Sequence, residues 1–185
     1  MPNTAQQYAT YQDLEDLPSN MVGEIIHGML HAHPRPAPRH ARASSMIGID
    51  VGNPFDKGVN GPGGWWILDE PELHLGEDIF VPDLAGWRRE RMPELPQTAW
   101  FELVPDWVCE VLSPSTARFD RAEKMPLYAH YGVGYCWLVD PDLLTLEAYK
   151  LVGEHWVLLK TLDKDKMVSI EPFDATEFSL ADLWA

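Results

Sequence analysis

The sequence predicts a single α/β domain over residues 1–185, and three observations lead to this prediction. The length is that of one domain, large enough to bury a substantial core without cross-links. Two near-continuously apolar segments, Trp107–Leu112 and Tyr135–Val139, have the pattern of central strands that are buried on both faces. A helical segment, Asp120–Tyr131, lies between them, so the three together indicate a strand–helix–strand unit with parallel strands.

The elements before this unit follow from local signals. Thr10 suits the N-cap of a short helix over Tyr11–Leu17. The segment Val22–His31 predicts two strands joined by a tight turn. The proline-rich stretch Ala32–Pro38 predicts a rigid loop, and the apolar spacing of Arg39–Val51 predicts a helix after it.

Loops and short strands complete the expected fold. The segment Asn53–Gly64 is rich in glycine and proline and predicts an exposed loop. Short apolar segments bounded by turn residues predict three strands, at Trp65–Leu68, Leu73–Leu75 and Ile79–Ala85. After the central unit, we expect a hairpin at the sheet edge and then a short helix, over Leu144–Leu151 with His155–Leu159 and over Thr176–Leu183.

Composition and charge limit the classes of function. With 45% hydrophobic and 23% charged residues, the chain is an ordinary globular protein. The formal net charge of −15 argues against a dedicated duplex DNA binder, because affinity for nucleic acid rests largely on neutralising phosphates. Most basic residues nevertheless fall in three clusters, which form either a basic rim around an acidic centre or solvated faces: Arg35, Arg39 and Arg42; Arg88, Arg89 and Arg91; Arg118, Arg121 and Lys124.

The ends of the chain and its cysteines indicate a compartment. Met1–Ala5 lacks a basic region followed by an apolar stretch, so we expect no signal peptide. No apolar run approaches the roughly 18–20 residues that span a bilayer. Cys109 and Cys136 lie inside apolar segments, where we expect them to be reduced, buried and inert. These features predict a cytoplasmic protein with no membrane segment.

Glu110 is the first candidate for a functional residue. It is an ionisable side chain in the middle of an apolar strand, and burying an unpaired carboxylate costs several kcal/mol. One compensating partner is Arg118, which would make the position structural. The other is a divalent cation, since Mg²⁺ is typically held by one or two carboxylates together with water and substrate phosphate.

Asp83 is the better second acid. Asp106 lies on the same predicted strand as Glu110, but four residues of strand place it roughly 13 Å away, too far to share one ion. Asp83 lies on a separate strand, and side chains on adjacent strands approach to roughly 5 Å. We therefore expect Asp83 beside Glu110 and Asp106 at the entry to its strand.

Three further groups have alternative interpretations. Lys124 either points from its helix towards the acids, where it would stabilise charge on phosphorus, or forms an i,i+4 surface pair with Asp120. Glu24 is either a third acid or a solvent-facing strand residue. The histidines match no strong zinc spacing, and a proline-rich loop is a poor zinc cage: His27, His31, His33 and His40.

At this point the chain resembles a known family. The motifs resemble those of the Uma family, described as putative restriction endonucleases, which is a bacterial branch of the PD-(D/E)xK nuclease superfamily. The resemblance covers about Thr10 to Tyr149, most of the chain. It is carried by these segments: Thr10–Leu14, Gly23–Gly28, Pro82–Leu84, Pro105–Thr116, Asp120 with Lys124, Tyr128, and Tyr131–Pro141.

The resemblance implies a restriction-endonuclease-like α/β core, with a mixed central β-sheet flanked by helices. It also implies Asp83 and Glu110 as ligands of Mg²⁺ or Mn²⁺, Lys124 as the basic residue and Glu24 as an accessory acid. Two departures stand out. The superfamily's Glu-x-Lys has Leu112 in the lysine place, so Lys124 would supply the amine, and His27 stands where the family usually has aspartate.

Two classes of function follow. The first is a metal-dependent endonuclease that hydrolyses phosphodiester bonds of nucleic acid, in the first place a Mg²⁺-dependent endodeoxyribonuclease acting on DNA. The alternative is a catalytically inactive, homodimeric binding module on the same scaffold, in which an arginine would neutralise Glu110. A hydrolase of small phosphoesters would share the acidic site but needs no basic groove. A symmetric homodimer is our expectation for a protein of this size.

Overall fold

The computed structural model describes residues 8–184. The segment on which the signal-peptide expectation rests, and the ends of the predicted domain, lie outside the described residues. The main sheet has six strands in the order β10-β9-β8-β7-β6-β3. Their bounds are β3 Trp65–Asp69, β6 Leu84–Arg88, β7 Trp107–Val111, β8 Tyr135–Asp140, β9 Thr145–Val152 and β10 His155–Asp163.

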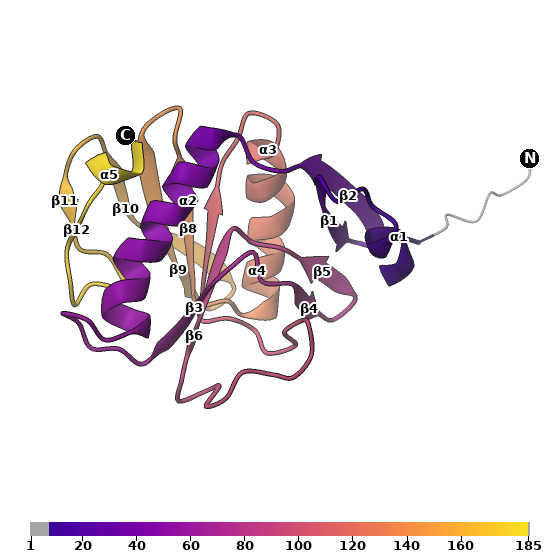
Figure 1. Ribbon diagram of the computed structural model, residues 1–185, viewed down its shortest axis with the longest axis horizontal. Helices are drawn as coiled ribbons and strands as arrows, with labels where there is room; N and C mark the ends of the chain where they lie inside the picture. The colour runs from indigo at the N-terminus through magenta and orange to yellow at the C-terminus, as the bar shows by residue number, and fades with distance from the viewer. Residues whose placement is uncertain (1–7, 185) are drawn as a thin grey trace, which may run out of the picture.

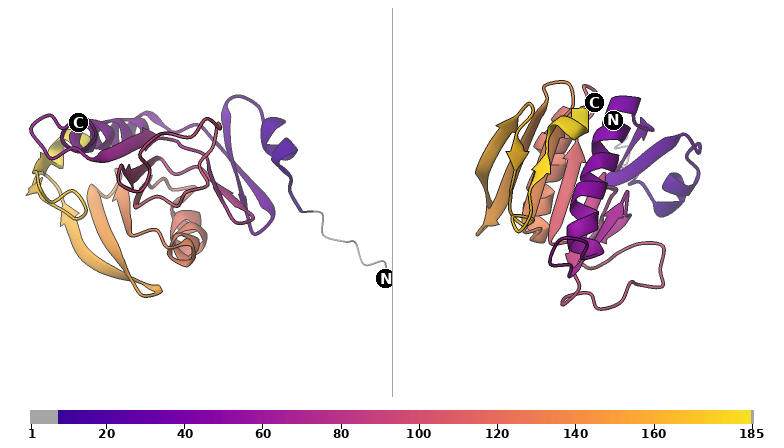
Figure 2. Two further views of the ribbon diagram at one scale, coloured as in Figure 1. Left: turned by 90° about the horizontal axis from the view of Figure 1, so that it is seen from below. Right: turned by 60° about the vertical axis from the view of Figure 1, so that its left-hand side comes forward.

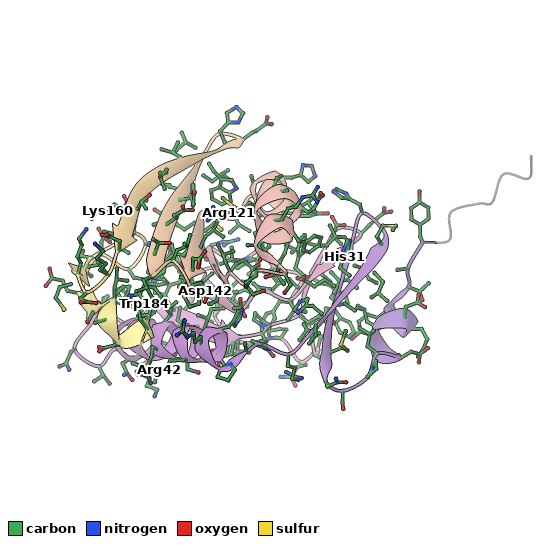
Figure 3. The ribbon with its side chains drawn as sticks, turned by 90° about the horizontal axis from the view of Figure 1, so that it is seen from above. His31, Arg42, Arg121, Asp142, Lys160 and Trp184 are labelled. Atoms are coloured by element: carbon green, nitrogen blue, oxygen red, sulfur yellow. The ribbon has the colours of Figure 1, made fainter. Side chains whose placement is uncertain are left out.

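Helices cover both faces of this sheet (Figures 1 and 2). Helix α2, Pro38–Val51, packs on one face together with the short C-terminal helix α5, Ala181–Trp184. Figure 3 shows Trp184 of α5 on the side of the sheet that α2 covers. The other face carries one continuous helical segment, made of α3 Ala117–Phe119, the π-helical turn η2 Asp120–Lys124, and α4 Met125–Tyr131.

The pairing of β7 makes the sheet mixed. It runs parallel to β8, with Trp107 opposite Tyr135, and antiparallel to β6, with Cys109 opposite Leu84. The remaining neighbours in the sheet pair antiparallel, and β9 with β10 forms the hairpin at its edge. The predicted strand–helix–strand unit with parallel strands is therefore confirmed.

The alternation of side chains along β7 places Glu110. Trp107 and Cys109 belong to the hydrophobic core under α2 and α5, whereas Val108 belongs to the core under α4. Successive strand residues point to opposite faces, so Glu110 shares the α4 face with Val108. The apolar strand thus carries its carboxylate towards the helical segment that contains Lys124.

A second, four-stranded sheet stands beside the main one, in the order β2-β1-β5-β4 (Figure 1). Its strands are β1 Met21–Ile26, β2 Met29–Pro34, β4 Leu73–Leu75 and β5 Asp78–Phe80. The turn between β1 and β2 takes left-handed backbone angles at His27 and Gly28 (φ 52° and 72°), as a tight hairpin turn requires. Helix α1, Tyr11–Glu15, follows a capping box in which the Thr10 N–H donates to Asp13 at 2.7 Å.

Four predicted elements differ from the structure. Strand β2 continues to Pro34, into the predicted loop, because its backbone pairs with β1 as far as Met21. The predicted exposed loop begins as a helical turn, η1 Gly52–Asp56, whose Phe55 is buried in the core. The terminal helix is shorter than expected, because Phe178–Ser179 forms strand β12 against β11, Met167–Val168.

The fourth difference concerns the predicted strand Ile79–Ala85. It is divided between β5, in the small sheet, and β6, in the main sheet, with a short link between them. The chain therefore passes from one sheet to the other at the position of Asp83. Among the described residues, no helix is long and apolar enough to cross a membrane.

Candidate active site

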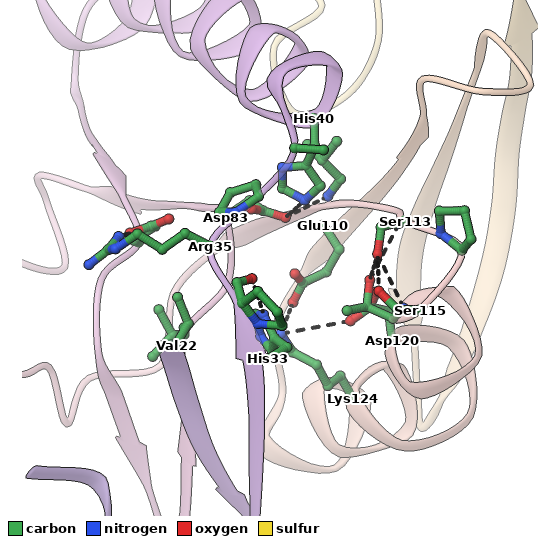
Figure 4. Close-up of a pocket in the computed structure, with 18 residues that line it drawn as sticks. Val22, His33, Arg35, His40, Asp83, Glu110, Ser113, Ser115, Asp120 and Lys124 are labelled. Atoms are coloured by element: carbon green, nitrogen blue, oxygen red, sulfur yellow. Dashed lines mark hydrogen bonds and ion pairs between the residues drawn. The ribbon is translucent and has the colours of Figure 1, made fainter. Parts of the chain in front are cut away.

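Four carboxylates and one lysine meet where the two sheets and the helical segment come together (Figure 4). The five residues come from four separate parts of the chain, and four of them were predicted as site residues. Their positions are Glu24 on β1, Asp83 in the link between β5 and β6, Glu110 on β7, and Asp120 with Lys124 on η2.

Lys124 is the centre of this cluster. Its Nζ lies 2.7 Å from Oε1 of Glu110, 2.8 Å from Oε1 of Glu24 and 3.9 Å from Oδ1 of Asp120. The lysine side chain is 3% exposed, so it points into the protein and not along the helix surface. The pair with Asp120 does form, but it is buried, and the interpretation of Lys124 as a surface pair is wrong.

Glu110 is held by two donors. The Tyr128 hydroxyl donates to the same Oε1 at 2.6 Å, one helical turn beyond Lys124. Glu24 is likewise held from both sides, because its Oε1 accepts the Val81 backbone N–H at 2.8 Å as well as facing Lys124. Glu24 is 1% exposed, so its interpretation as a solvent-facing strand residue is also wrong.

Asp83 occupies the outer position of the cluster. Its Oδ2 accepts the Val111 backbone N–H at 2.8 Å, which ties it to the end of the strand that carries Glu110. Its side chain is 16% exposed, more than those of the other acids. The imidazole Nε2 of His40, in the first turns of α2, lies 3.4 Å from Asp83 Oδ2.

Three of these residues were not predicted as part of the site: Asp120, His40 and Tyr128. The sequence signal for Asp120 was its i,i+4 spacing to Lys124, which does not tell a buried pair from an exposed one. His40 had no usable signal, because the position of α2 over the end of β7 is a tertiary feature. Its Nδ1 is buried and has no hydrogen-bond partner among residues 8–184.

The other candidates lie outside the cluster. Asp106 accepts the Arg88 backbone N–H at 2.8 Å and pairs with Arg91 at 2.8 Å, so it organises the entry to β7 as expected. Arg118 is exposed, and the cation beside Glu110 is Lys124. The part of the chain that the structure describes contains no group of three or more His, Cys, Asp or Glu arranged to hold a metal ion by themselves.

Burial and crowding of like charges control protonation in the cluster. Burial raises the pKa of Glu110 well above its ordinary value, although Lys124 opposes this shift. Burial also raises the pKa of Asp120, to about 6, again against the effect of Lys124. Burial disfavours the charge on Lys124, but the Glu110 and Glu24 carboxylates outweigh it and raise the lysine pKa well above the usual range. The lysine therefore stays charged, while burial favours the protonated forms of Glu110 and Asp120.

Four members of the cluster line a cavity of about 290 Å³: Asp83, Glu110, Asp120 and Lys124. The end of β2 at Pro34 and the link that follows it, with Arg35, form one side of the cavity, and the segment after β7, with Ser113 and Ser115, forms another (Figure 4). The Ser113 hydroxyl lies 3.0 Å from the hydroxyl of Ser115. The site is thus an acidic pocket with one buried ammonium group and uncharged hydroxyls on its rim.

The chain is similar to known proteins both in its sequence pattern and in its fold. The model of the Uma2 family, described as "Putative restriction endonuclease", matches residues 8–181. A solved structure from Anabaena variabilis ATCC 29413, described as "a putative nuclease belonging to DUF820", is similar with a TM-score of 0.75 and 24% identity, covering 95% of this chain and 97% of that chain. No curated protein matches the chain.

The structural similarity shows the fold, and with the mixed sheet flanked by helices it confirms the predicted fold class. Family and fold together support a nuclease. Because the family model matches most of the chain, the protein belongs to the Uma2 family, the family described as putative restriction endonucleases.

Proposed function

We propose that this protein is a Mg²⁺- or Mn²⁺-dependent endonuclease that hydrolyses phosphodiester bonds, with DNA as its first expected substrate. The observation that carries the proposal is the buried cluster at the floor of the cavity, in which one lysine faces three carboxylates. A group of this kind is costly to bury, so a purely structural role is a poor explanation. Family membership supports the same reaction class.

The donor set fits a divalent cation. Asp83 and Glu110 come from neighbouring strands, one position beyond the registered pair Leu84 and Cys109, and they would be the ligands. Four carboxylates against one ammonium group leave an excess of negative charge that a cation would offset. These two carboxylates alone are too few to fill the coordination shell of the ion. This is usual for Mg²⁺, which keeps water and substrate phosphate as further ligands. Such an ion would activate water as a nucleophile and neutralise charge on the phosphate.

Lys124 has a defined part in this proposal. Its raised pKa keeps it protonated, so it serves as a hydrogen-bond donor and a positive charge and does not act as a general base. From the floor of the cavity, its ammonium group would orient the attacking water and stabilise the charge that develops on the phosphate oxygens. Glu24 and Asp120 hold the ammonium group in place.

The remaining contacts fix the orientation of the acids. Tyr128 donates to Glu110 from the helix, and the Val111 N–H donates to Asp83 from the end of β7. Both donors come from rigid elements, so the carboxylates are pre-organised and lose little conformational freedom when substrate arrives.

The alternative hypothesis, an inactive binding module, predicts that an arginine lies beside Glu110 and neutralises it. Lys124 and Tyr128 are instead the side chains that donate to Glu110 among the described residues. A lysine among three acids is the arrangement that the nuclease hypothesis requires, so we favour the nuclease.

The test is cleavage of supercoiled plasmid, single-stranded DNA and RNA in Mg²⁺ or Mn²⁺. The wild-type protein is compared with Asp83→Asn, with Lys124→Met and with Asp163→Asn, a surface acid that pairs with the neighbouring Lys164 and Lys166. We expect cleavage that the first two substitutions abolish and the third leaves intact. Cleavage that survives both site substitutions would show that another site, or a contaminant, is responsible.

A further inference from the structure

We propose that the pocket accepts a single strand of nucleic acid and excludes an intact duplex. This inference rests on the proposed nuclease function and names its class of substrate. Four features of the described residues support it: the depth of the reacting groups, the contacts that join two elements beside the pocket, the small number of cations that line it, and the hydroxyl groups on its rim.

The proposed reacting groups lie at the bottom of the cavity. The side chains of Glu110 and Lys124 are 4% and 3% exposed, and Asp83 at 16% is the most accessible member of the cluster. A phosphodiester must therefore descend into the cavity to reach them. The cavity volume of about 290 Å³ is at the low end of the range for small-molecule pockets, so it admits a group no larger than a small ligand.

The β1–β2 hairpin and the helical segment both line the pocket, through Pro34 and Lys124 among others, and they contact each other beside it. The ring of His31 on β2 packs at a tilt against Phe119 of α3 with centroids 4.4 Å apart, and Figure 3 shows His31 on the part of the hairpin that faces the helices. The buried pair of Lys124 and Glu24, at 2.8 Å, also joins the helical segment to β1. These contacts join the two elements on this side of the pocket, whereas a rigid duplex needs an open trough along which it can lie.

The residues that line the cavity carry too few positive charges to neutralise many phosphates. Of the described residues that line the cavity, Arg35 is the one arginine and Lys124 the one lysine, and Lys124 is already surrounded by carboxylates. Arg35 pairs with Glu70 at 3.2 Å. Tight duplex binders typically neutralise about 6–10 phosphates, and a lining with one available arginine falls well short of this number.

The rim offers uncharged donors in place of cations. Ser113, Ser115 and Thr116 hold a network of hydroxyl contacts at 3.0 Å on the wall opposite Arg35. Hydroxyl and backbone groups commonly bind phosphate oxygens and position a strand without requiring a basic surface. A flexible single strand would place one phosphate between Arg35 and this wall and its neighbour at the acidic floor.

Duplex DNA cannot place its phosphates in the pocket in this way without distortion. Its phosphates lie on the outside of a stiff rod, and bringing one into a narrow pocket requires bending or unpairing, which costs a few kcal/mol. A single strand has no such cost. The geometry therefore favours single-stranded, frayed or branched substrates.

The experiment uses one labelled DNA strand, free, annealed as a blunt duplex, and annealed as a fork with an unpaired arm, together with an RNA of the same sequence. A penalty of a few kcal/mol predicts cleavage of the free strand at least ~10-fold faster than the duplex, and cuts in the fork within its unpaired arm. Equal or faster cleavage of the duplex would overturn the inference while leaving the nuclease intact. The RNA arm tells whether the single strand must be DNA.

Binding is measured in parallel, by fluorescence anisotropy with Ca²⁺ in place of Mg²⁺. If no substrate is cut, the proposed function fails, but tighter binding of the single strand than of the duplex still supports the inference, and equal or weaker binding overturns it. His31→Ala, which removes the ring against Phe119, should reduce the preference for the single strand. His155→Ala, on the exposed edge strand β10, is the matched control and should leave the preference unchanged.

Discussion

Replacing Lys124 by methionine tests the buried cluster directly. The substitution keeps most of the side-chain volume but removes the ammonium group that lies 2.8 Å from Glu24 and 2.7 Å from Glu110. At least one carboxylate then remains in the core without a cation. Removing one partner of a buried ion pair typically destabilises a protein by about 3–5 kcal/mol.

The structure also predicts how this penalty depends on pH. The uncompensated carboxylate can escape its penalty by taking up a proton, which for a glutamate of ordinary pKa costs about 4 kcal/mol at pH 7 and about 2 kcal/mol at pH 5.5. In the variant, the folded-state pKa of that acid lies above its unfolded value, so stability is lost as the pH rises. The variant should therefore lose about 2 kcal/mol of stability between these two pH values for an acid that stays neutral in its folded state.

Urea unfolding of both proteins at the two pH values measures this difference. The matched control is Lys150→Met, which removes a partly exposed ion pair with Glu171 at 2.7 Å and should have little effect on stability at either pH. Adding Glu24→Gln to the Lys124→Met variant should recover part of the loss, because it removes a stranded charge. A penalty below about 1 kcal/mol at pH 7, or a variant whose own stability does not fall between the two pH values, would refute the claim that Lys124 is the charged centre of the cluster.

Three further predictions concern other contacts. Burial and a neighbouring acid raise the pKa of Asp50 to about 6, so this residue makes the folded protein less stable as the pH rises from about 4 to 6. In urea titrations, Asp50→Asn should therefore raise the free energy of unfolding by about 1 kcal/mol at pH 7, after allowance for the partial exposure of Asp50, and should give no gain at pH 4. Tyr128→Phe removes the 2.6 Å hydrogen bond to Glu110 and should cost about 2 kcal/mol, and an unchanged unfolding midpoint would contradict this. Arg35→Gln should raise KM for a single strand with little change in kcat, whereas Arg39→Gln, which does not line the cavity, should leave both unchanged.

Several features of the fold and site follow from patterns short enough to read in the sequence. The apolar run around Glu110 identified a central strand and its functional residue together. A strand that is buried on both faces tolerates a carboxylate only where a partner compensates the cost of burying its charge. The tight turn at His27 and Gly28 and the hairpin of β9 and β10 were likewise predictable, since they depend on neighbouring residues.

The surroundings of Asp83 are an example of structure that local sequence patterns do not predict. Its segment has the composition of one strand, but the chain leaves the small sheet after Phe80 and enters the main sheet at Leu84. Nothing in the apolar pattern marks this passage, because both halves are buried. The sequence predicted that Asp83 lies beside Glu110, but the tertiary structure decides that its carboxylate is held by the Val111 N–H and approached by His40.

The sequence by itself determined the order of elements, the parallel strand–helix–strand unit, and the candidate acids and lysine, because these depend on periodicity and spacing along the chain. Only the tertiary structure decided that Lys124 points inward to Glu24, Glu110 and Asp120, and that His40 and Tyr128 join them. The physical reason is that helix spacing allows a lysine to face solvent or core equally well. The packing of the helical segment against both sheets selects the inward direction, and the buried carboxylates stabilise its charge there.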